Sequence, residues 1–311
     1  MTSMPCAIRP AALVAALLCL APAAATAPPA LAAVVERFAS DPLAAGHAVP
    51  FYVEGDVASR FTFLPEEPSR FPGDRPGTLR VLYDTTLPAA RIFTPLGRVA
   101  SLDDDFAFGA ILTIRSEGFQ ADPNGFSQIA FGLWNGHTTG IDRTGFPSDS
   151  FDLVEFDYFA NAGPFGGPFL SPTVFGGEVG GNAFFNFAFQ SSETRLPLDV
   201  PLLCQFRYAA ADRALSLTVS RHARGLTFAT LPGAAVTVDL SRLSPTFLVD
   251  AAGIAAYFEG STSLHAVVDY DLLYVGDLPA PWGVVARRPP ARPPAAATGP
   301  GPRKTNRKGG L

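Results

Sequence analysis

Residues Phe151 to Asn161 read Phe-Asp-Leu-Val-Glu-Phe-Asp-Tyr-Phe-Ala-Asn, and this stretch decides the fold. Its side chains alternate with a period of two, as in a β-strand whose two faces differ. One face, which we predict to lie in a core, carries Val154, Phe156 and Tyr158. The opposite face carries Glu155, Asp157 and Phe159. Carboxylates about two strand rises of 3.3 Å apart indicate an antiparallel sheet whose second face is solvated or bears a site.

Further strands are predicted on both sides of this stretch, separated by turns such as Asp122-Pro123-Asn124-Gly125 and Gly166-Gly167-Pro168. No helical period lasts longer than a turn or two outside the N-terminal segment. The expected strands cover residues 51–53, 60–64, 77–83, 106–114, 128–134, 184–190, 201–208, 215–219, 235–240, 253–258 and 265–275. Many short strands at this spacing predict an all-β fold, a two-sheet antiparallel β-sandwich.

The two ends of the chain differ from this body. Arg9 is the only charge before Glu36, and an Ala/Leu-rich run ends in small-x-small sites, the layout of a secretory signal peptide. We predict a signal peptide at 1–32, a sandwich at 34–280 and a disordered Pro/Ala/Arg-rich tail at 281–311. An uncleaved membrane anchor is the alternative, but the apolar run is short for a bilayer. The mature chain is then secreted, extracellular or periplasmic, with no transmembrane segment.

Charge and cysteine content narrow the function further. Removing the seven basic residues of the tail and Arg9 from the 23 basic residues leaves 15 against 28 acidic ones, so the body is near −13. An acidic body of this kind excludes nucleic acid as a partner. After signal removal only Cys204 remains, which excludes an internal disulfide. Cys204 shares a strand face with Leu202 and Phe206, which predicts a buried apolar residue rather than a nucleophile.

Residues 154–161, Val-Glu-Phe-Asp-Tyr-Phe-Ala-Asn, resemble the metal-binding strand of legume lectins. Most of the chain from Val34 to Gly276 is similar to members of the concanavalin A-like lectin/glucanase superfamily, secreted bacterial ones included. The resemblance implies a jelly roll, and possible calcium ligation by Asp157, the Phe159 carbonyl and Asn161. The predicted loop at 162–173 lacks the Asp and His that complete the paired metal sites of those lectins, so other residues would have to supply three or more oxygen ligands.

The same strand resembles glycoside hydrolase family 16, whose signature is E-x-D-x-x-E. Glu155 and Asp157 match the nucleophile and its helper, but Ala160 stands where that family has its acid/base residue. Retaining hydrolysis needs a second carboxyl about 5–5.5 Å from the first. A hydrolase would therefore have to recruit another acid, and the candidates are Glu178, Glu193 and Asp149. The sequence thus favours a protein without hydrolytic activity.

Carbohydrate binding without hydrolysis needs an open face, an aromatic platform and a few polar groups. We predict the ligand-binding residues to be Trp134, Asn135, Arg143, Glu155, Asp157 and Asn161, with carbohydrate or polysaccharide as the partner. Two interpretations of Trp134 stay open: a sugar platform, or packing beneath the loop at 136–147. A structural, envelope-associated sandwich without a ligand and a glycoside hydrolase using Glu155 are the alternative functions.

Overall fold

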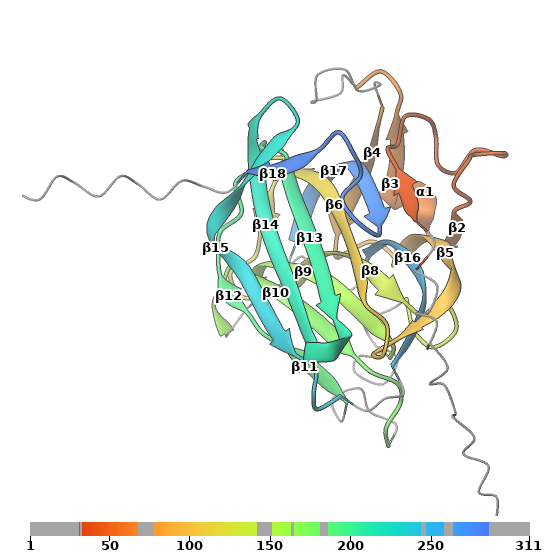
Figure 1. The fold of residues 1–311 in the computed structure, drawn as a ribbon. Coiled ribbons are helices and arrows are strands. Elements are labelled where there is room, and N and C mark those ends of the chain that lie inside the picture. The colour runs from red at the N-terminus through yellow and green to blue at the C-terminus, as the bar shows by residue number, and fades with distance from the viewer. Residues whose placement is uncertain are drawn as a thin grey trace, which may run out of the picture.

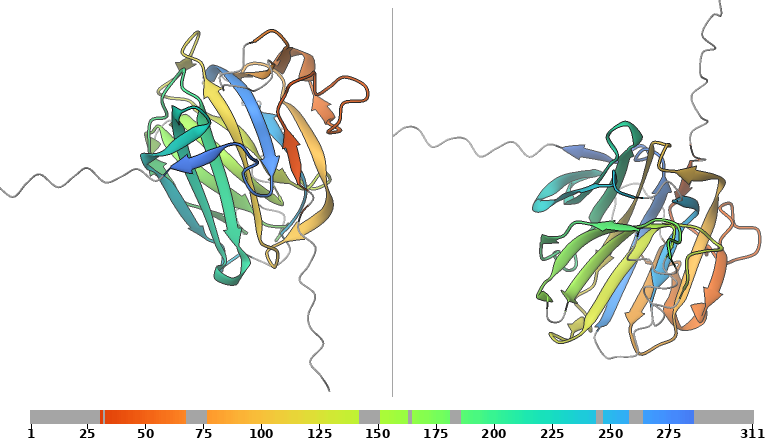
Figure 2. Two further views of the ribbon diagram at one scale, coloured as in Figure 1. Left: turned by 45° about the horizontal axis from the view of Figure 1, so that its top comes forward. Right: turned by 90° about the horizontal axis from the view of Figure 1, so that it is seen from below.

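The computed structural model describes residues 31, 33–67, 77–141, 151–162, 165–180, 186–243, 247–257 and 264–285. Within these ranges the chain forms two packed β-sheets (Figures 1 and 2). The helical elements described are α1 (Val57–Arg60) and the 3₁₀ turn η4 (Ala210–Asp212). Among the described residues no helix is long and apolar enough to cross a membrane. The predicted all-β sandwich is confirmed.

The ten-stranded sheet has the order β18-β15-β14-β13-β6-β17-β4-β3, with β1 and β7 also paired to β17. Its strands are β1 (Val34–Glu36), β3 (Phe61–Leu64), β4 (Thr78–Asp84), β6 (Phe106–Ile114), β7 (Gln120–Ala121), β13 (Leu202–Ala209), β14 (Ala214–Arg224), β15 (Thr227–Asp239), β17 (Leu264–Val275) and β18 (Gly283–Val285). All pairings in it are antiparallel except that of β15 with β18.

The eight-stranded sheet has the order β11-β10-β9-β8-β16-β5-β2, with β12 also paired to β10. Its strands are β2 (Tyr52–Gly55), β5 (Ala90–Ser101), β8 (Phe126–Trp134), β9 (Leu153–Ala162), β10 (Phe169–Phe175), β11 (Phe187–Phe189), β12 (Ser192–Glu193) and β16 (Leu248–Ala256). The stretch that predicted the fold is β9, an interior strand of this sheet.

The main hydrophobic core lies between the two sheets. Val154, Phe156 and Tyr158 belong to it, as the alternation predicts. Phe156 stacks on Phe131 of β8 at a centroid distance of 4.9 Å, and Phe108 stacks on Phe206 at 4.5 Å. Aromatic pairs in this geometry add to the free energy gained by burying their area.

Cys204 is buried in the same core and free, as predicted. Burial raises the pKa of its thiol well above the ordinary range. A thiol of this kind is a packing residue rather than a nucleophile.

Three features differ from the sequence-based expectations. Residues 169–175, predicted to be part of a loop, form β10, and residues 90–101 form β5, which was not predicted. The fold also continues past the predicted boundary at residue 280, because β18 pairs with β15 and Trp282 is buried. The signal peptide at 1–32 falls outside the described residues apart from Leu31, as does the tail from residue 286.

Candidate functional site

The outer face of the eight-stranded sheet is the face that carries Glu155 and Asp157. Strand register aligns their side chains into two rows that cross β9, β8, β16, β5 and β2. The first row consists of Glu155, Gly132, Gly253, Phe93 and Tyr52. The second row consists of Asp157, Ala130, Ala255, Arg91 and Glu54. Small residues in the middle of both rows leave space above β8 and β16 for larger side chains from elsewhere.

Glu155 and Asp157 point away from the main core, as predicted, but they are not solvated. Each is only 1% exposed. Tyr257, which directly follows β16, donates its hydroxyl to Glu155 Oε1. The predicted exposure is therefore wrong, and the reason is that groups distant in sequence cover this face of β9.

Trp134 contributes to this cover. It is 1% exposed, meets Phe93 edge to face at 6.4 Å, and lies with its ring 5.3 Å from the Arg91 guanidinium carbon. The segment that follows crosses the same face, since Gly136 lies beside the Phe93 ring and the Ile141 side chain lies beside Gly55. An open sugar platform at Trp134 is thus wrong, and the alternative interpretation, packing beneath this loop, is confirmed for residues 136–141.

A hydrogen-bond network fixes the segment over the sheet. Asp152 accepts from the backbone N–H of Leu248 at 2.9 Å and from the Thr138 hydroxyl at 2.8 Å. Asp250 accepts from the backbone N–H of Gly136 at 2.8 Å. Burial raises the pKa of Asp152 and outweighs these two hydrogen bonds. The cover is therefore a fixed part of the structure.

The two predicted asparagines hold loops rather than line a cleft. The Asn135 carbonyl accepts from the backbone N–H groups of His137 and Thr138, and its amide donates to the Leu248 carbonyl at 3.2 Å. The Asn161 amide donates to the carbonyls of Asp122 and Gly125. Asn135 and Asn161 are thus structural in their observed contacts. Arg143 lies outside the described residues.

The same contacts bear on calcium. Within the described ranges no group of three or more His, Cys, Asp or Glu side chains is placed to hold a metal ion. Asn161 spends its amide group on the turn at 122–125. Ligation by Asp157 and Asn161 stays a prediction of the sequence resemblance, to which these contacts add no further ligand.

The accessible part of this face lies at its edge, on β2. Tyr52 is 55% exposed and stacks on Phe93 at 5.8 Å. Next to it, Glu54 Oε2 accepts from Nε and Nη2 of Arg91 at 2.8 and 2.7 Å. Arg91 is buried, whereas the Glu54 side chain keeps 36% of its surface exposed. An aromatic ring and a carboxylate thus stand side by side at the surface, both supported from below.

Tyr52, Glu54, Phe93, Arg91 and Tyr257 were all missed as site residues. The signal that was present is the period-two spacing of Tyr52 with Glu54 and of Arg91 with Phe93, which puts each pair on one face. Nothing in the sequence shows that β2 and β5 pair, and the site depends on that pairing.

Two buried nitrogens of this sheet lack hydrogen-bond partners within the described part of the chain. They are the indole Nε1 of Trp134 and the amide Nε2 of Gln128. A buried donor left unsatisfied costs about 1–3 kcal/mol. Gln128, Ala130 and Trp134 alternate with the core residues of β8, so both donors belong to the outer face. A ligand hydroxyl or a water molecule would satisfy them.

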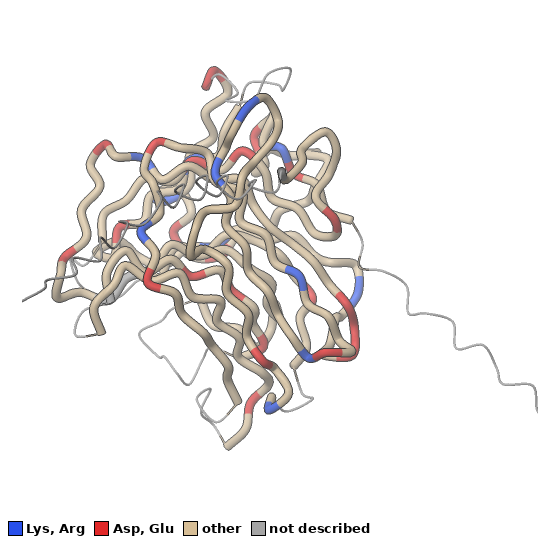
Figure 3. The backbone as a smooth tube through the Cα atoms, turned by 60° about the vertical axis from the view of Figure 1, so that its left-hand side comes forward, with Lys and Arg blue, Asp and Glu red and all other residues tan. Residues whose placement is uncertain are grey.

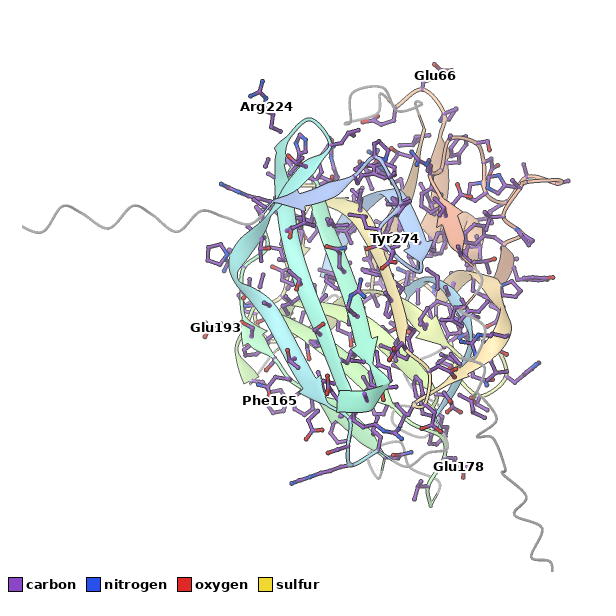
Figure 4. All side chains as sticks on the ribbon, in the orientation of Figure 1. Glu66, Phe165, Glu178, Glu193, Arg224 and Tyr274 are labelled. Carbon is purple, nitrogen blue, oxygen red and sulfur yellow. The ribbon has the colours of Figure 1, made fainter. Side chains whose placement is uncertain are left out.

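The acids considered for a hydrolytic mechanism are not gathered around Glu155. Ala160 packs toward the main core, so its position presents no group on the outer face. Glu178 and Glu193 are exposed at the periphery of the molecule (Figure 4). Asp149 falls outside the described residues. The described neighbours of Glu155 are therefore a tyrosine hydroxyl and Asp157 in the adjoining row.

Comparison with known proteins gives similarities of structure alone. No protein-family model and no curated protein sequence matches the chain. Among solved structures, lectin II from Ulex europaeus is 12% identical, with a TM-score of 0.43 over 78% of this chain and 97% of that chain. The metal-free lectin I-B4 from Griffonia simplicifolia is 12% identical, with a TM-score of 0.42 over 78% and 98%. A winged bean acidic lectin complexed with methyl-α-D-galactose is 12% identical, with a TM-score of 0.43 over 72% and 98%.

Proposed function

We propose that the chain is a secreted carbohydrate-binding protein that holds a polysaccharide along the β2 edge of the eight-stranded sheet. The observation that carries the proposal is the exposed Tyr52 ring, stacked on Phe93 beside the Glu54–Arg91 ion pair. A sugar ring presents an apolar C–H face and a rim of hydroxyls. An aromatic ring with an adjacent charged acceptor complements both.

Support from below makes this edge suited to binding. Arg91 is sandwiched between Glu54 and the rings of Phe93 and Trp134, with its guanidinium carbon 5.4 and 5.3 Å from the two ring centres. Its two donors hold the Glu54 carboxylate in place, so that a sugar hydroxyl can donate to Oε1. A preformed site of this kind loses little conformational entropy on binding.

Charge is compatible with a neutral or cationic polysaccharide. Asp and Glu are distributed among the Lys and Arg of the described chain (Figure 3), and the full chain has a net charge of −5. We therefore keep nucleic acid out of the proposal, since such partners select a basic surface.

Affinity electrophoresis against a panel of neutral and acidic polysaccharides, followed by calorimetry on the best ligand, tests this function. We expect Tyr52→Ala to weaken binding about tenfold, equivalent to about 1.4 kcal/mol, and Tyr52→Phe to keep most of it. Glu54→Gln should also weaken binding. Val53→Ala is the matched control, because Val53 is 53% exposed on the same strand but belongs to the other face.

Equal binding by Tyr52→Ala and Val53→Ala would remove the site from β2. If wild-type protein binds none of the polysaccharides, the envelope-associated structural alternative replaces the proposal.

Export is the second part of the proposal, and it has its own measurement. The charge-poor N-terminal run with two small-x-small sites supports a cleaved signal peptide. N-terminal sequencing of protein recovered from the medium or periplasm should begin at Ala33. Recovery of a membrane-bound chain beginning at Met1 would favour the anchor.

A further inference from the structure

Three side chains near the N-terminus form a continuous chain of hydrogen bonds. Ser40 Oγ lies 3.2 Å from His47 Nδ1, and His47 Nε2 lies 2.6 Å from Glu36 Oε2. A hydroxyl, an imidazole and a carboxylate in this order are the elements of a hydrolytic triad, which is identified by geometry and not by sequence order. The cluster is separate from the proposed sugar-binding edge.

The local fold holds the base and the acid firmly. Glu36 ends β1, and its Oε1 accepts from the backbone N–H of Phe38. Phe38 is fully buried and has a φ of +50°, a left-handed conformation that a non-glycine residue rarely adopts. Phe51 packs its ring 6.4 Å from those of both Phe38 and His47. The loop from Phe38 to His47 is therefore positioned by buried rings.

The hydrogen bonds assign the protons. Glu36 accepts, so Nε2 of His47 carries the hydrogen, and Nδ1 then has the lone pair that accepts from the Ser40 hydroxyl. Burial separates the roles further. The side chains of Glu36 and His47 are only 5% and 8% exposed, whereas Ser40 lies at the surface. The nucleophile is thus accessible, and the groups that activate it are shielded from water.

We propose that Ser40 is the nucleophile of an esterase site, with His47 as general base and Glu36 as the positioning residue of His47. Ser40 Oγ attacks the ester carbonyl carbon while its proton passes to His47 Nδ1. The tetrahedral intermediate expels the alcohol, which takes that proton, and leaves acyl-Ser40. Water then attacks the acyl group, gives a proton to His47, and releases the carboxylic acid and free Ser40.

The intermediate needs hydrogen-bond donors for its oxyanion. Within the described part of the chain, the backbone N–H groups of Ser40 and Asp41 make no hydrogen bond, unlike those of Leu43, Ala44 and His47. They are the uncommitted donors nearest to the nucleophile along the chain. Because Ser40 is exposed beside the 38% exposed Leu43, the class of substrate is an ester with a short acyl group, such as acetyl.

Labelling with a fluorophosphonate probe and hydrolysis of p-nitrophenyl acetate test the site in the full chain. We expect wild-type protein to be labelled at Ser40, as located by peptide mass spectrometry. Ser40→Ala should abolish labelling and lower turnover about 100-fold or more, the range of general-base catalysis. Ser59→Ala is the matched control, because Ser59 is exposed and donates to a carboxylate, Asp56 at 2.8 Å, without a histidine. It should keep full labelling and turnover.

Glu36→Gln separates positioning from mere stability. It should lower kcat with little change in KM, and Glu36→Asp should restore part of the rate at equal melting temperature. Wild-type protein that is neither labelled nor active, or labelling that survives in Ser40→Ala, overturns the proposal. Since Ser40 is exposed, its alanine variant is expected to fold, so that loss of labelling there reports on chemistry.

Discussion

At the scale of single residues, Glu155 shows how a carboxylate is retained on a covered sheet face. It is almost fully buried and accepts a hydrogen bond from the Tyr257 hydroxyl. A buried carboxylate is tolerated only where it is hydrogen-bonded, and removal of a donor leaves its desolvation uncompensated.

Tyr257→Phe should therefore destabilise the fold by about 1–3 kcal/mol, the cost of leaving a buried acceptor short of a donor. Urea unfolding followed by circular dichroism measures this. Tyr52→Phe is the control, since the Tyr52 ring is 55% exposed and surface changes usually stay within about 0.5 kcal/mol. If the two variants are equally stable, the hydrogen bond to Glu155 contributes nothing.

The sequence predicted which way the side chains of β9 point, but not what covers them. The alternation of Val154 with Glu155 determines the face, because successive strand residues point to opposite sides. Exposure depends on Tyr257, Trp134 and the segment at 135–141, which reach this face from other strands. Asp157→Asn, harmless on an exposed strand, is consequently a substitution at a buried position.

At the scale of elements, the turn between β5 and β6 depends on one carboxylate. Asp104 Oδ2 accepts from the backbone N–H and hydroxyl of Ser101 at 2.8 and 3.0 Å, and Oδ1 accepts from Arg98 at 3.0 Å. Burial by itself raises the pKa of Asp104, but these hydrogen bonds and the Arg98 charge outweigh it. The pKa consequently lies below its ordinary value of 3.8.

A lowered folded-state pKa means that the stabilisation is complete above the unfolded-state value and is lost as the pH falls through the folded-state value. Asp104→Asn should cost about 1.5–3 kcal/mol at pH near 7, as for hydrogen bonds to charged groups. The difference from wild type should shrink below pH of about 3.8, where wild-type Asp104 is itself protonated. Urea titrations at both pH values measure it. A difference that is constant with pH would show that charge plays no part.

β5 and β10 were missed because both contain strand breakers that their neighbours accommodate. Pro172 of β10 lies where β11 ends opposite Thr173 and β12 begins opposite Leu170, so its missing N–H faces no ladder partner. In β5, Pro95 borders a bulge opposite Asp250, and Gly97 has a φ of +73°. Proline and glycine are tolerated at such irregular positions, which only the strand pairing reveals.

At the scale of the whole molecule, the C-terminal end of the described chain closes the outer face of the ten-stranded sheet. Trp282 is 6% exposed in a second apolar cluster with Ile111, Leu203, Phe228, Leu272 and Tyr274. Arg37, just after β1, stacks on the Trp282 ring at 4.3 Å and donates to the Ala280 carbonyl at 3.0 Å. The two ends of the fold are thus joined.

The sequence concealed this closure, because residues 282–285 offer only a few apolar side chains before the Pro/Ala/Arg-rich tail. So short a run has no detectable period. Its burial depends on the apolar patch that β6, β13 and β17 assemble from distant parts of the chain.

Two truncations and one substitution locate the end of the folded domain. Truncation after Val285 should leave the free energy of unfolding within about 0.5 kcal/mol of wild type, as for surface changes. Truncation after Ala280 removes both Trp282 and β18, so it should cost at least as much as Trp282→Ala, which we expect to be about 3–5 kcal/mol. Urea unfolding at fixed salt gives the three values. If truncation after Ala280 is as stable as truncation after Val285, then Trp282 does not stabilise the sandwich, and the domain ends at residue 280 after all.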